Sequence, residues 1–364
     1  ELDEDDVLYL LYTSGTTGLP KGVMLTHKNV IADAINATIE FDIVHDDILL
    51  HFFPLSYIAG CWSTMDFFYH GATNVIIEGF EPKAILETTE REKITALIIV
   101  PSMLISLLEC PNFDRYDLSS LRKIMYGGAA MPPEVLKRGI KAFGNIFIQL
   151  YSLIEARLST CLHQEEHVVE GPEEKVRRLS SCGRETINVE VRVVDEDGND
   201  VAPGEVGEII VRGDNVMKGY WRLPRATEEA LKGDYLYTGD LGSMDEQGYL
   251  YSSDRKKDMI ISGGNRIYPR EIEDIIYHHP SIFEAAVIET PHEELGEVVK
   301  AVVVLKEGMK ATEREIIELC KQSLPSYAIP QSVEFIDRMP KNPSGKILKR
   351  ELRERMLGGR LKCK

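Results

Sequence analysis

The sequence carries little positive charge and lacks a long hydrophobic run. Lysine and arginine number 42 against 59 aspartate and glutamate residues, so the 364-residue chain has a formal net charge of −17. Such a chain repels phosphate backbones and anionic headgroups unless it has a local basic patch, and no such patch occurs before residue 340. The longest stretch without a charged residue, 48–65, contains His51, Pro54 and Gly60 and is too polar to span a membrane. We therefore expect no nucleic-acid partner and no integral membrane span.

Patterned cysteines and two common enzyme motifs are also missing. The six cysteines contain no C-x-x-C pair, which excludes a disulfide framework and fits a reducing cytoplasm. The sequence has no G-x-S-x-G motif and no G-x-G-x-x-G motif, so nothing in it indicates an α/β-hydrolase or a dinucleotide-binding enzyme. His163 and His167 lie near Cys161, Glu165 and Glu166, but a strand end without a fourth well-spaced ligand argues against zinc there.

The composition, 43% hydrophobic and 28% charged, is that of a folded globular protein, and the length suggests two or three domains. The chain starts at Glu1 without Met and enters an apolar strand by Val7. We therefore expect that an N-terminal portion is absent.

Two kinds of hydrophobic pattern divide the chain. Residues 7–151 alternate short apolar runs with amphipathic stretches, which is typical of βαβ units and a mostly parallel sheet. Residues 187–212 are period-two runs joined by the turn EDGND, which predicts antiparallel hairpins in a small β subdomain. Beyond the charged turn Asp254–Asp258, residues 269–337 predict helix, strand, strand, helix and strand, which is a compact α+β unit.

The segment YTSGTTGLPKG (12–22) combines hydroxyls, glycines and one lysine between a predicted strand and a predicted helix. Glycines let backbone N–H groups face an anion, hydroxyls donate to its oxygens, and Lys21 supplies a positive charge. Its spacing differs from the G-x-x-x-x-G-K-[ST] loop. Composition alone is equally compatible with a flexible polar loop, whereas the flanking strand and helix favour polyphosphate binding.

Further motifs follow in order along the chain. They are FFPLSYIAG (52–60), YGGAAMP (126–132), QLYSLIEA (149–156), YLYTGDLG (235–242), DRKKDMIISGGNRIYPREIE (254–273) and PKNPSGKILKREL (340–352). Together with residues 12–22 they resemble the motifs of the adenylate-forming superfamily of acyl-CoA synthetases, peptide-synthetase adenylation domains and luciferases. The resemblance is closest to the fatty acyl-CoA synthetases and runs from Tyr12 to Leu352.

This resemblance implies an α/β fold with two domains. Residues 1–256 would be the C-terminal portion of a large, partly absent adenylation domain with parallel sheets and a small β-barrel-like subdomain. Residues 257–364 would be a small mobile α+β domain that carries a catalytic lysine. The implied cofactors are ATP, Mg²⁺ and coenzyme A. A carboxylate attacks the α-phosphate of ATP to release pyrophosphate, and the thiol of coenzyme A then displaces AMP.

The resemblance also implies roles for single residues around the nucleotide. Glu155 would ligate Mg²⁺, and Asp240 and Arg255 would contact the ribose. The other cofactor-binding candidates are Thr13, Ser14, Gly15, Thr16, Thr17, Gly18 and Lys21 for the phosphates, Gly127, Gly128, Ala129 and Tyr151 for adenine, and Gly264 for the pantetheine channel. Without the resemblance, the alternative for Glu155 is a solvated strand-end carboxylate, Asp240 is better explained as part of an ordinary turn, and Arg255 is equally compatible with a solvated turn.

Lys346 is the implied catalytic lysine, which would bridge the carboxylate and the α-phosphate in the first step. Lys257 would be the hinge about which the small domain moves between the two steps. The acyl pocket would be drawn from Tyr57, Ile58, Gly60, Cys61, Gly128 and Leu153. Because this set is mostly apolar, we expect a fatty or aryl acid.

Two departures from the family pattern lie next to Glu155. The family usually has glycine at position 152 and a hydroxyl residue at 154, where this chain has Ser152 and Ile154. Loss of one donor to the α-phosphate can cost about 2.7–4 kcal/mol of transition-state stabilisation. We interpret the chain as a cytoplasmic, AMP-forming carboxylic acid–CoA ligase. A carrier-loading adenylation domain, a catalytically weak nucleotide-binding regulator and a homodimeric assembly all stay open.

Overall fold

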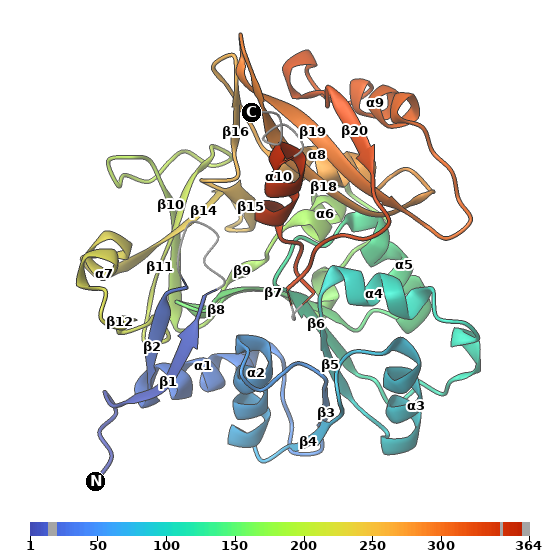
Figure 1. Cartoon of the computed structure of the whole chain (residues 1–364). Coiled ribbons are helices and arrows are strands. Elements are labelled where there is room, and N and C mark those ends of the chain that lie inside the picture. The colour runs from blue at the N-terminus through green and yellow to red at the C-terminus, as the bar shows by residue number, and fades with distance from the viewer. Residues whose placement is uncertain (14–19, 343–344, 359–364) are drawn as a thin grey trace. The chain divides into compact units, whose positions relative to one another are not determined.

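The computed structural model describes residues 1–13, 20–342 and 345–358, and the side chains of this last stretch to 356. The chain separates into two compact units (Figure 1). The first comprises 1–131 and 135–252, and the second comprises 253–364 together with the short segment 132–134. None of the helices in the described residues is long and apolar enough to cross a membrane.

The first unit is built on a seven-stranded sheet. Five neighbouring strands are parallel, and two further strands continue the sheet in antiparallel pairing. In spatial order they are β4 (Thr73–Ile76), β3 (Ile48–His51), β5 (Ala96–Ile99), β6 (Lys123–Gly127), β7 (Phe147–Leu153), β8 (Arg157–Leu162) and β9 (Arg184–Glu185). This sheet confirms the parallel α/β fold that the alternating pattern predicts.

Helices connect these strands, and their starts follow from local chemistry. The side chain of Thr26 accepts a hydrogen bond from the Asn29 N–H and begins α1, and a proline opens both α3 and α4. The helices that begin in this part of the chain are α1 (His27–Glu40), α2 (Ile58–Tyr69), α3 (Pro82–Glu92), α4 (Pro101–Leu108), α5 (Pro133–Phe143), α6 (Glu173–Arg177) and α7 (Pro224–Ala230). The uncharged stretch 48–65 thus supplies β3 and much of α2.

Two smaller antiparallel groups complete the first unit. One contains β1 (Val7–Tyr12), β2 (Gly22–Thr26) and β12 (Gly219–Tyr220). The other contains β10 (Val189–Val194), β11 (Gly207–Gly213), β14 (Tyr235–Met244) and β13 (Leu231–Lys232), and β15 (Leu250–Arg255) pairs with β14. The second group is the half-barrel subdomain that the period-two runs predict.

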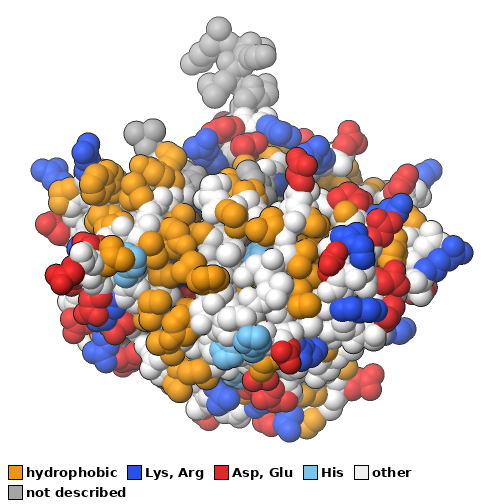
Figure 2. All heavy atoms as spheres, turned by 90° about the horizontal axis from the view of Figure 1, so that it is seen from below, with side chains coloured by type: hydrophobic (Ala, Val, Ile, Leu, Met, Phe, Trp, Pro, Cys, Tyr) orange, Lys and Arg blue, Asp and Glu red, His pale blue; other side chains and the backbone are white. Residues whose placement is uncertain are grey.

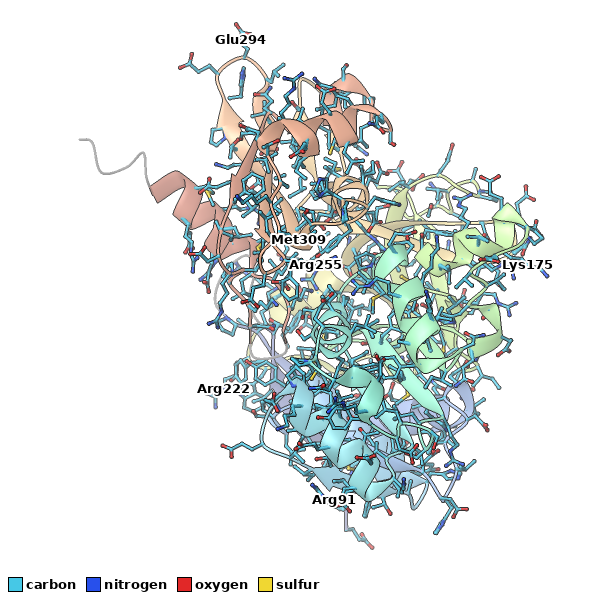
Figure 3. All side chains as sticks on the ribbon, turned by 90° about the vertical axis from the view of Figure 1, so that its right-hand side faces the viewer. Arg91, Lys175, Arg222, Arg255, Glu294 and Met309 are labelled. Carbon is cyan, nitrogen blue, oxygen red and sulfur yellow. The ribbon has the colours of Figure 1, made fainter. Side chains whose placement is uncertain are left out.

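Within its described residues, the second unit combines an antiparallel hairpin with three α-helices. The long strands β18 (Ile282–His292) and β19 (Gly296–Leu305) form its centre, and β20 (Ser332–Phe335) joins β19 in parallel. Figure 3 labels Glu294 in the turn of this hairpin. The remaining elements are β16 (Ile260–Ser262), β17 (Asn265–Ile267), α8 (Pro269–Ile276), α9 (Glu313–Lys321) and α10 (Lys349–Gly358).

Several large apolar side chains of the first unit are exposed. They include Ile31 and Ile39 of α1, Phe68 and Tyr69 of α2, and Ile76 of β4. Figure 2 shows hydrophobic side chains gathered across the face that is seen from below. Apolar side chains that gather on a surface commonly contribute to contacts with other chains.

Candidate functional site

Strands β1 and β2 hold together the two ends of segment 12–22, which is called the polyphosphate-loop candidate below. The Thr13 N–H donates to the Lys21 carbonyl at 2.9 Å, and the Lys21 N–H donates to Thr13 Oγ1 at 3.3 Å. These contacts bring the first and last predicted phosphate-binding residues side by side. The predicted residues Ser14, Gly15, Thr16, Thr17 and Gly18 lie outside the described residues.

Lys21 is linked to Glu155 through a tyrosine that the sequence analysis missed. The Lys21 Nζ lies 4.7 Å from the centroid of the Tyr220 ring, and the Tyr220 hydroxyl donates to Glu155 Oε1 at 2.9 Å. Tyr220 reaches this position because β12 pairs with β2, opposite Val23. Only the aromatic pair that follows Gly219 could have indicated it from the sequence.

The backbone around Glu155 is fixed by the segment that precedes Tyr220. The Met217 N–H donates to the Glu155 carbonyl at 2.8 Å. The Asn215 side-chain amide donates to the carbonyls of Ala156 and Leu158. Glu155 is half-buried, and a single carboxylate of this kind suits Mg²⁺, which prefers oxygen ligands and keeps several waters or phosphate oxygens.

The adenosine candidates Tyr151 and Asp240 come together across two sheets. The Tyr151 hydroxyl donates to Asp240 Oδ2 at 2.9 Å, and the Asp240 N–H donates to Thr238 Oγ1 at 3.1 Å. Burial, and then the charge of Asp240, raises the pKa of Tyr151 well above its usual value. The Tyr151 hydroxyl therefore stays protonated and donates to the carboxylate at neutral pH.

Gly127, the last residue of β6, meets a packing requirement. A Cβ on Gly127 would lie 2.4 Å from the Leu150 carbonyl oxygen on neighbouring β7, so only glycine fits there. Gly128 and Ala129 are exposed directly after this strand. Gly127 thus has a structural reason for being glycine, and Gly127, Gly128 and Ala129 all stay candidates for the adenine floor.

The predicted acyl-pocket residues lie along the start of α2 and the end of β7. Tyr57 precedes α2, and Ile58 and Leu153 pack against the hydrophobic cluster that contains buried Cys61. A Cβ on Gly60 would lie only 2.3 Å from the Pro54 carbonyl oxygen, so backbone packing requires this glycine. Ile154 packs against the same cluster, which accounts for an apolar residue where the family has a hydroxyl.

Lys346 belongs to the second unit and lies just before α10. Its N–H donates to Asn342 Oδ1 at 2.9 Å, and its carbonyl accepts from the Asn342 N–H at 2.9 Å. Lys341 and Ile347 form an isolated β-bridge beside these contacts. Asn342 and Lys346 are therefore held together by one backbone and one side-chain hydrogen bond.

The hinge candidate Lys257 is flanked by residues that α10 anchors. The Lys349 Nζ lies 2.8 Å from Glu273 and 3.9 Å from Asp254, and Arg353 contacts Asp258 at 2.9 Å. The turn 254–258 is thus tied to the helix that follows Lys346 within the same unit.

The two other candidates from this unit lie in strand–turn structure. Arg255 ends β15, where Figure 3 labels it. Gly264 lies in the turn between β16 and β17, where a Cβ would meet no atom of the described residues within 4 Å. The nucleotide candidates Lys21, Glu155 and Asp240 belong instead to the first unit.

Comparison with known proteins places the chain beside adenylating ligases. A family model for AMP-binding enzymes matches residues 1–221, and one for the C-terminal domain of AMP-binding enzymes matches 271–346. A feruloyl-CoA synthase from Amycolatopsis is 40% identical over 355 residues, which cover 96% of this chain and 70% of that protein. A long-chain fatty acid–CoA ligase from Bacillus subtilis is 38% identical over 355 residues, which cover 96% of this chain and 62% of that protein.

A solved structure agrees in fold. The crystal structure of ATP-bound MatB from Rhodopseudomonas palustris superposes with a TM-score of 0.89 at 32% identity. The superposition covers 97% of this chain and 69% of that chain. The chain thus spans 62% to 70% of the length of these three proteins.

Proposed function

This chain belongs to the AMP-binding enzyme family of adenylate-forming ligases, and from that premise we propose that it forms an acyl-adenylate from ATP and an apolar carboxylic acid and then an acyl-CoA. The observation that carries the proposal is the arrangement of Lys21, Tyr220 and Glu155 beside the polyphosphate-loop candidate. It brings a cation and a carboxylate together beside that loop, which supports a polyanion site of the kind that adenylation requires.

The chain's own residues divide the work in the first step. Lys21 and the hydroxyls from Thr13 to Thr17 would bind the β- and γ-phosphates, and Asp240 would orient the ribose. Glu155 would hold Mg²⁺, which neutralises charge on the phosphate oxygens when it is bound. Lys346 would add an ammonium group between the acid and the α-phosphate.

The second step would need a different position of the second unit. Lys257 would be the pivot, Arg255 would keep a ribose contact, and Gly264 would leave room for the pantetheine arm of coenzyme A. In this proposal residues 1–256 hold the substrates and residues 257–364 move.

The apolar character of the acid is supported by the cluster around Cys61. Ile58, Leu153 and Ile154 pack against this cluster, so a chain or ring that entered here would meet hydrocarbon. Of the proteins named above, one is a feruloyl-CoA synthase and another is a long-chain fatty acid–CoA ligase. We therefore propose a fatty or aryl substrate.

The deciding experiment is a screen of pyrophosphate release across fatty and aryl acids of graded length, with the full chain, ATP and Mg²⁺. Acid-dependent release followed by thioester formation with free coenzyme A is the expected result. Transfer to a carrier protein but not to coenzyme A would favour a carrier-loading enzyme. Nucleotide binding without acid-dependent AMP formation would contradict the proposal and favour a regulatory protein.

A further inference from the structure

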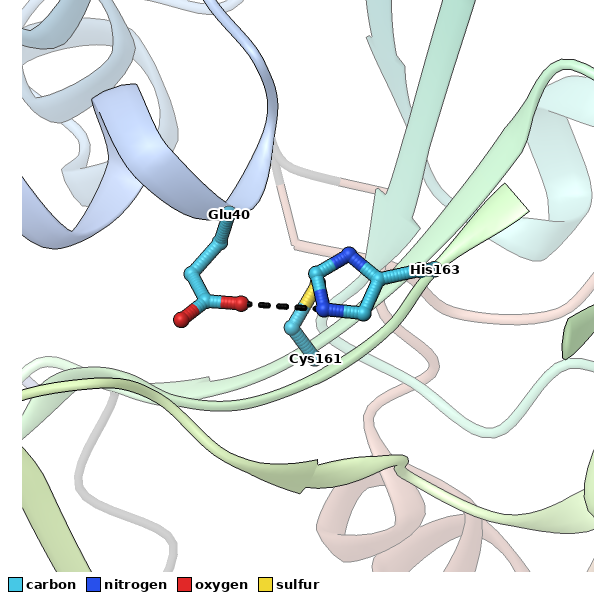
Figure 4. A group of neighbouring side chains, drawn as sticks. All are labelled: Glu40, Cys161 and His163. Carbon is cyan, nitrogen blue, oxygen red and sulfur yellow. Dashed lines mark ion pairs between the residues drawn. The ribbon is translucent and has the colours of Figure 1, made fainter. Parts of the chain in front are cut away.

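A second group of metal-binding side chains lies outside the proposed nucleotide site. The ligand atoms of Glu40, Cys161 and His163 all lie within 4.8 Å of one another, and Glu40 Oε2 is 3.2 Å from His163 Nε2. Figure 4 shows the three side chains facing one another, with Glu40 at the end of α1 and the other two at the end of β8. Cys161 and His163 share a face because residues two apart in an extended chain point the same way.

The sequence analysis argued against zinc around Cys161, and the structure changes the group of side chains that has to be considered there. His167 uses both ring nitrogens elsewhere, since Nε2 lies 3.0 Å from the Tyr126 hydroxyl and Nδ1 lies 2.8 Å from the His163 carbonyl. Glu166 accepts hydrogen bonds from the Tyr249 hydroxyl and the His163 N–H. The third ligand instead comes from α1, which no local spacing around Cys161 could reveal.

The chemistry of this trio suits zinc. Thiolate, imidazole and carboxylate are the zinc ligands of proteins, and bond lengths of about 2.0–2.3 Å place tetrahedral ligand atoms roughly 3.3–3.8 Å apart. Side-chain rotations that move each ligand atom by about 1 Å would bring Glu40, Cys161 and His163 to that spacing. Metal binding would transfer the thiol proton of Cys161 to solvent and form a metal–sulfur bond.

The surroundings of the trio also favour a cation. The second oxygen of Glu40, Oε1, accepts a hydrogen bond from the Ile187 N–H at 3.0 Å, which fixes the orientation of the carboxylate. Cys161 is 2% exposed, whereas the His163 side chain is 35% exposed, so solvent reaches one side of the trio.

We propose that Glu40, Cys161 and His163 form a three-ligand site for a zinc-type divalent cation, with water as the fourth ligand. The site would join the last residue of α1 to the end of β8. Since the Asp33 side chain of the same helix binds Arg157 at the start of β8, the cation would reinforce an existing contact between these elements.

The test is titration of metal-free protein with Co²⁺, which replaces zinc and absorbs light when thiolate binds it. We expect one equivalent of Co²⁺ to give a sulfur-to-cobalt charge-transfer band and Zn²⁺ to abolish it. The proposed Mg²⁺ ligand Glu155 offers only oxygen atoms, so Co²⁺ bound there would give no sulfur-to-cobalt band. Failure of the band to appear in folded protein would overturn the proposal.

Variants separate the ligands from the rest of the chain. Cys161→Ser should lose the band, and Glu40→Gln and His163→Gln should weaken Co²⁺ binding by roughly tenfold or more. Cys110→Ser, which changes a cysteine outside the trio, is the matched control and should keep the band. Persistence of the band in Cys161→Ser would assign it to another thiol and contradict the site.

The site can still be tested if Cys161→Ser folds poorly. Glu40→Gln and His163→Gln alter partly accessible side chains, and circular dichroism can verify that they fold. A thermal shift on Zn²⁺ addition in the unchanged protein, reduced in both variants, supports the site. An equal shift in all three proteins contradicts it. Neither readout depends on acyl-CoA formation.

Discussion

At the scale of single residues, buried polar side chains of α1 position the Glu155 segment. Asp33 accepts from the Arg157 Nε and from the Leu158 N–H, both at 2.9 Å. These bonds hold Arg157 at a φ of 52°, a left-handed conformation that is uncommon for a residue with a side chain. The Asn29 amide donates to the carbonyls of Asp214 and Val216, in the segment that leads to Tyr220. Residues outside every motif therefore place Glu155 and Tyr220.

Tyr220→Phe tests whether this tyrosine supports the proposed metal ligand. The variant loses the hydrogen bond from the Tyr220 hydroxyl to Glu155, and a hydrogen bond to a charged group contributes about 1.5–3 kcal/mol. The rate of adenylate formation should therefore fall by roughly tenfold or more, and a higher Mg²⁺ concentration should be needed to reach half of the maximal rate. Thioester formation from supplied acyl-adenylate should change little. Tyr235→Phe removes a similar hydroxyl contact, to Glu190, away from the site and is the control. If adenylate formation depends on the Mg²⁺ concentration in the same way in Tyr220→Phe and Tyr235→Phe, Tyr220 does not support the metal ligand.

Lys346→Ala tests the proposed catalytic lysine. Loss of the ammonium group should abolish adenylate formation by removing the charge that offsets the meeting of carboxylate and α-phosphate. The thioester-forming step should survive when acyl-adenylate is supplied, and the two half-reactions can be measured separately. Lys321→Ala, on the exposed side of α9, is the control. Similar losses in both half-reactions would rule out the assigned role.

At the scale of elements, α10 and α8 hold the turn that carries Lys257. Lys349 and Arg353 are four residues apart, so they lie on one face of α10 and contact carboxylates of the turn and of its neighbours. The N–H of Arg270 at the start of α8 donates to Asp254 Oδ2 at 2.8 Å. Three segments that are separate in sequence thus form one charged network inside the second unit.

The helix α8 also carries a carboxyl group that should make stability depend on pH. Burial raises the pKa of Asp274 to about 6, although Arg270 opposes this shift. In the unfolded chain this group ionises near 3.9, so the folded state binds more protons between about pH 4 and 6. The free energy of unfolding should therefore fall as the pH rises through this window.

Asp274→Asn should flatten that part of the pH dependence. Calorimetric unfolding between about pH 4 and 7 measures the effect, with Glu307→Gln at an exposed position as control. A slope that is unchanged in Asp274→Asn would show that another group causes the pH dependence.

At the scale of the whole molecule, the chain consists of two compact units joined near residue 252. The domain boundary predicted from the sequence, between residues 256 and 257, lies four residues after this division and next to the hinge candidate Lys257. It stays a prediction. The candidates for nucleotide binding belong to the first unit, and Lys346 belongs to the second. The proposed mechanism therefore requires the second unit to act in both steps.

Lys257→Pro tests this requirement. Proline fixes φ and should restrict rotation at the hinge, so thioester formation should slow far more than adenylate formation. Lys257→Ala removes the side chain and keeps backbone freedom, so it should behave nearly like the unchanged protein. The hinge assignment fails if proline slows the two steps equally, or if alanine reproduces its effect.

Much of the fold could be predicted from local patterns. The alternating pattern of residues 7–151 corresponds to the strands and helices of the parallel sheet, and the period-two runs of 187–212 contain the half-barrel strands β10 and β11. The helix α2 was not predicted because apolar residues predominate in it and its few polar residues leave no clear helical periodicity. Within the candidate site, the motifs supplied Lys21, Glu155 and Asp240 as candidates, whereas Tyr220 belongs to none of the motifs and was missed.

The sequence by itself determined the order of the motifs, the alternation of strand and helix, and the family, because each is written in short contiguous stretches. Only the tertiary structure decided which distant residues meet. It brought Tyr220 to Glu155, Asp33 to Arg157, and Glu40 to the pair Cys161 and His163. Such contacts depend on how sheets and helices pack, and packing is a property of the whole chain that no local spacing encodes.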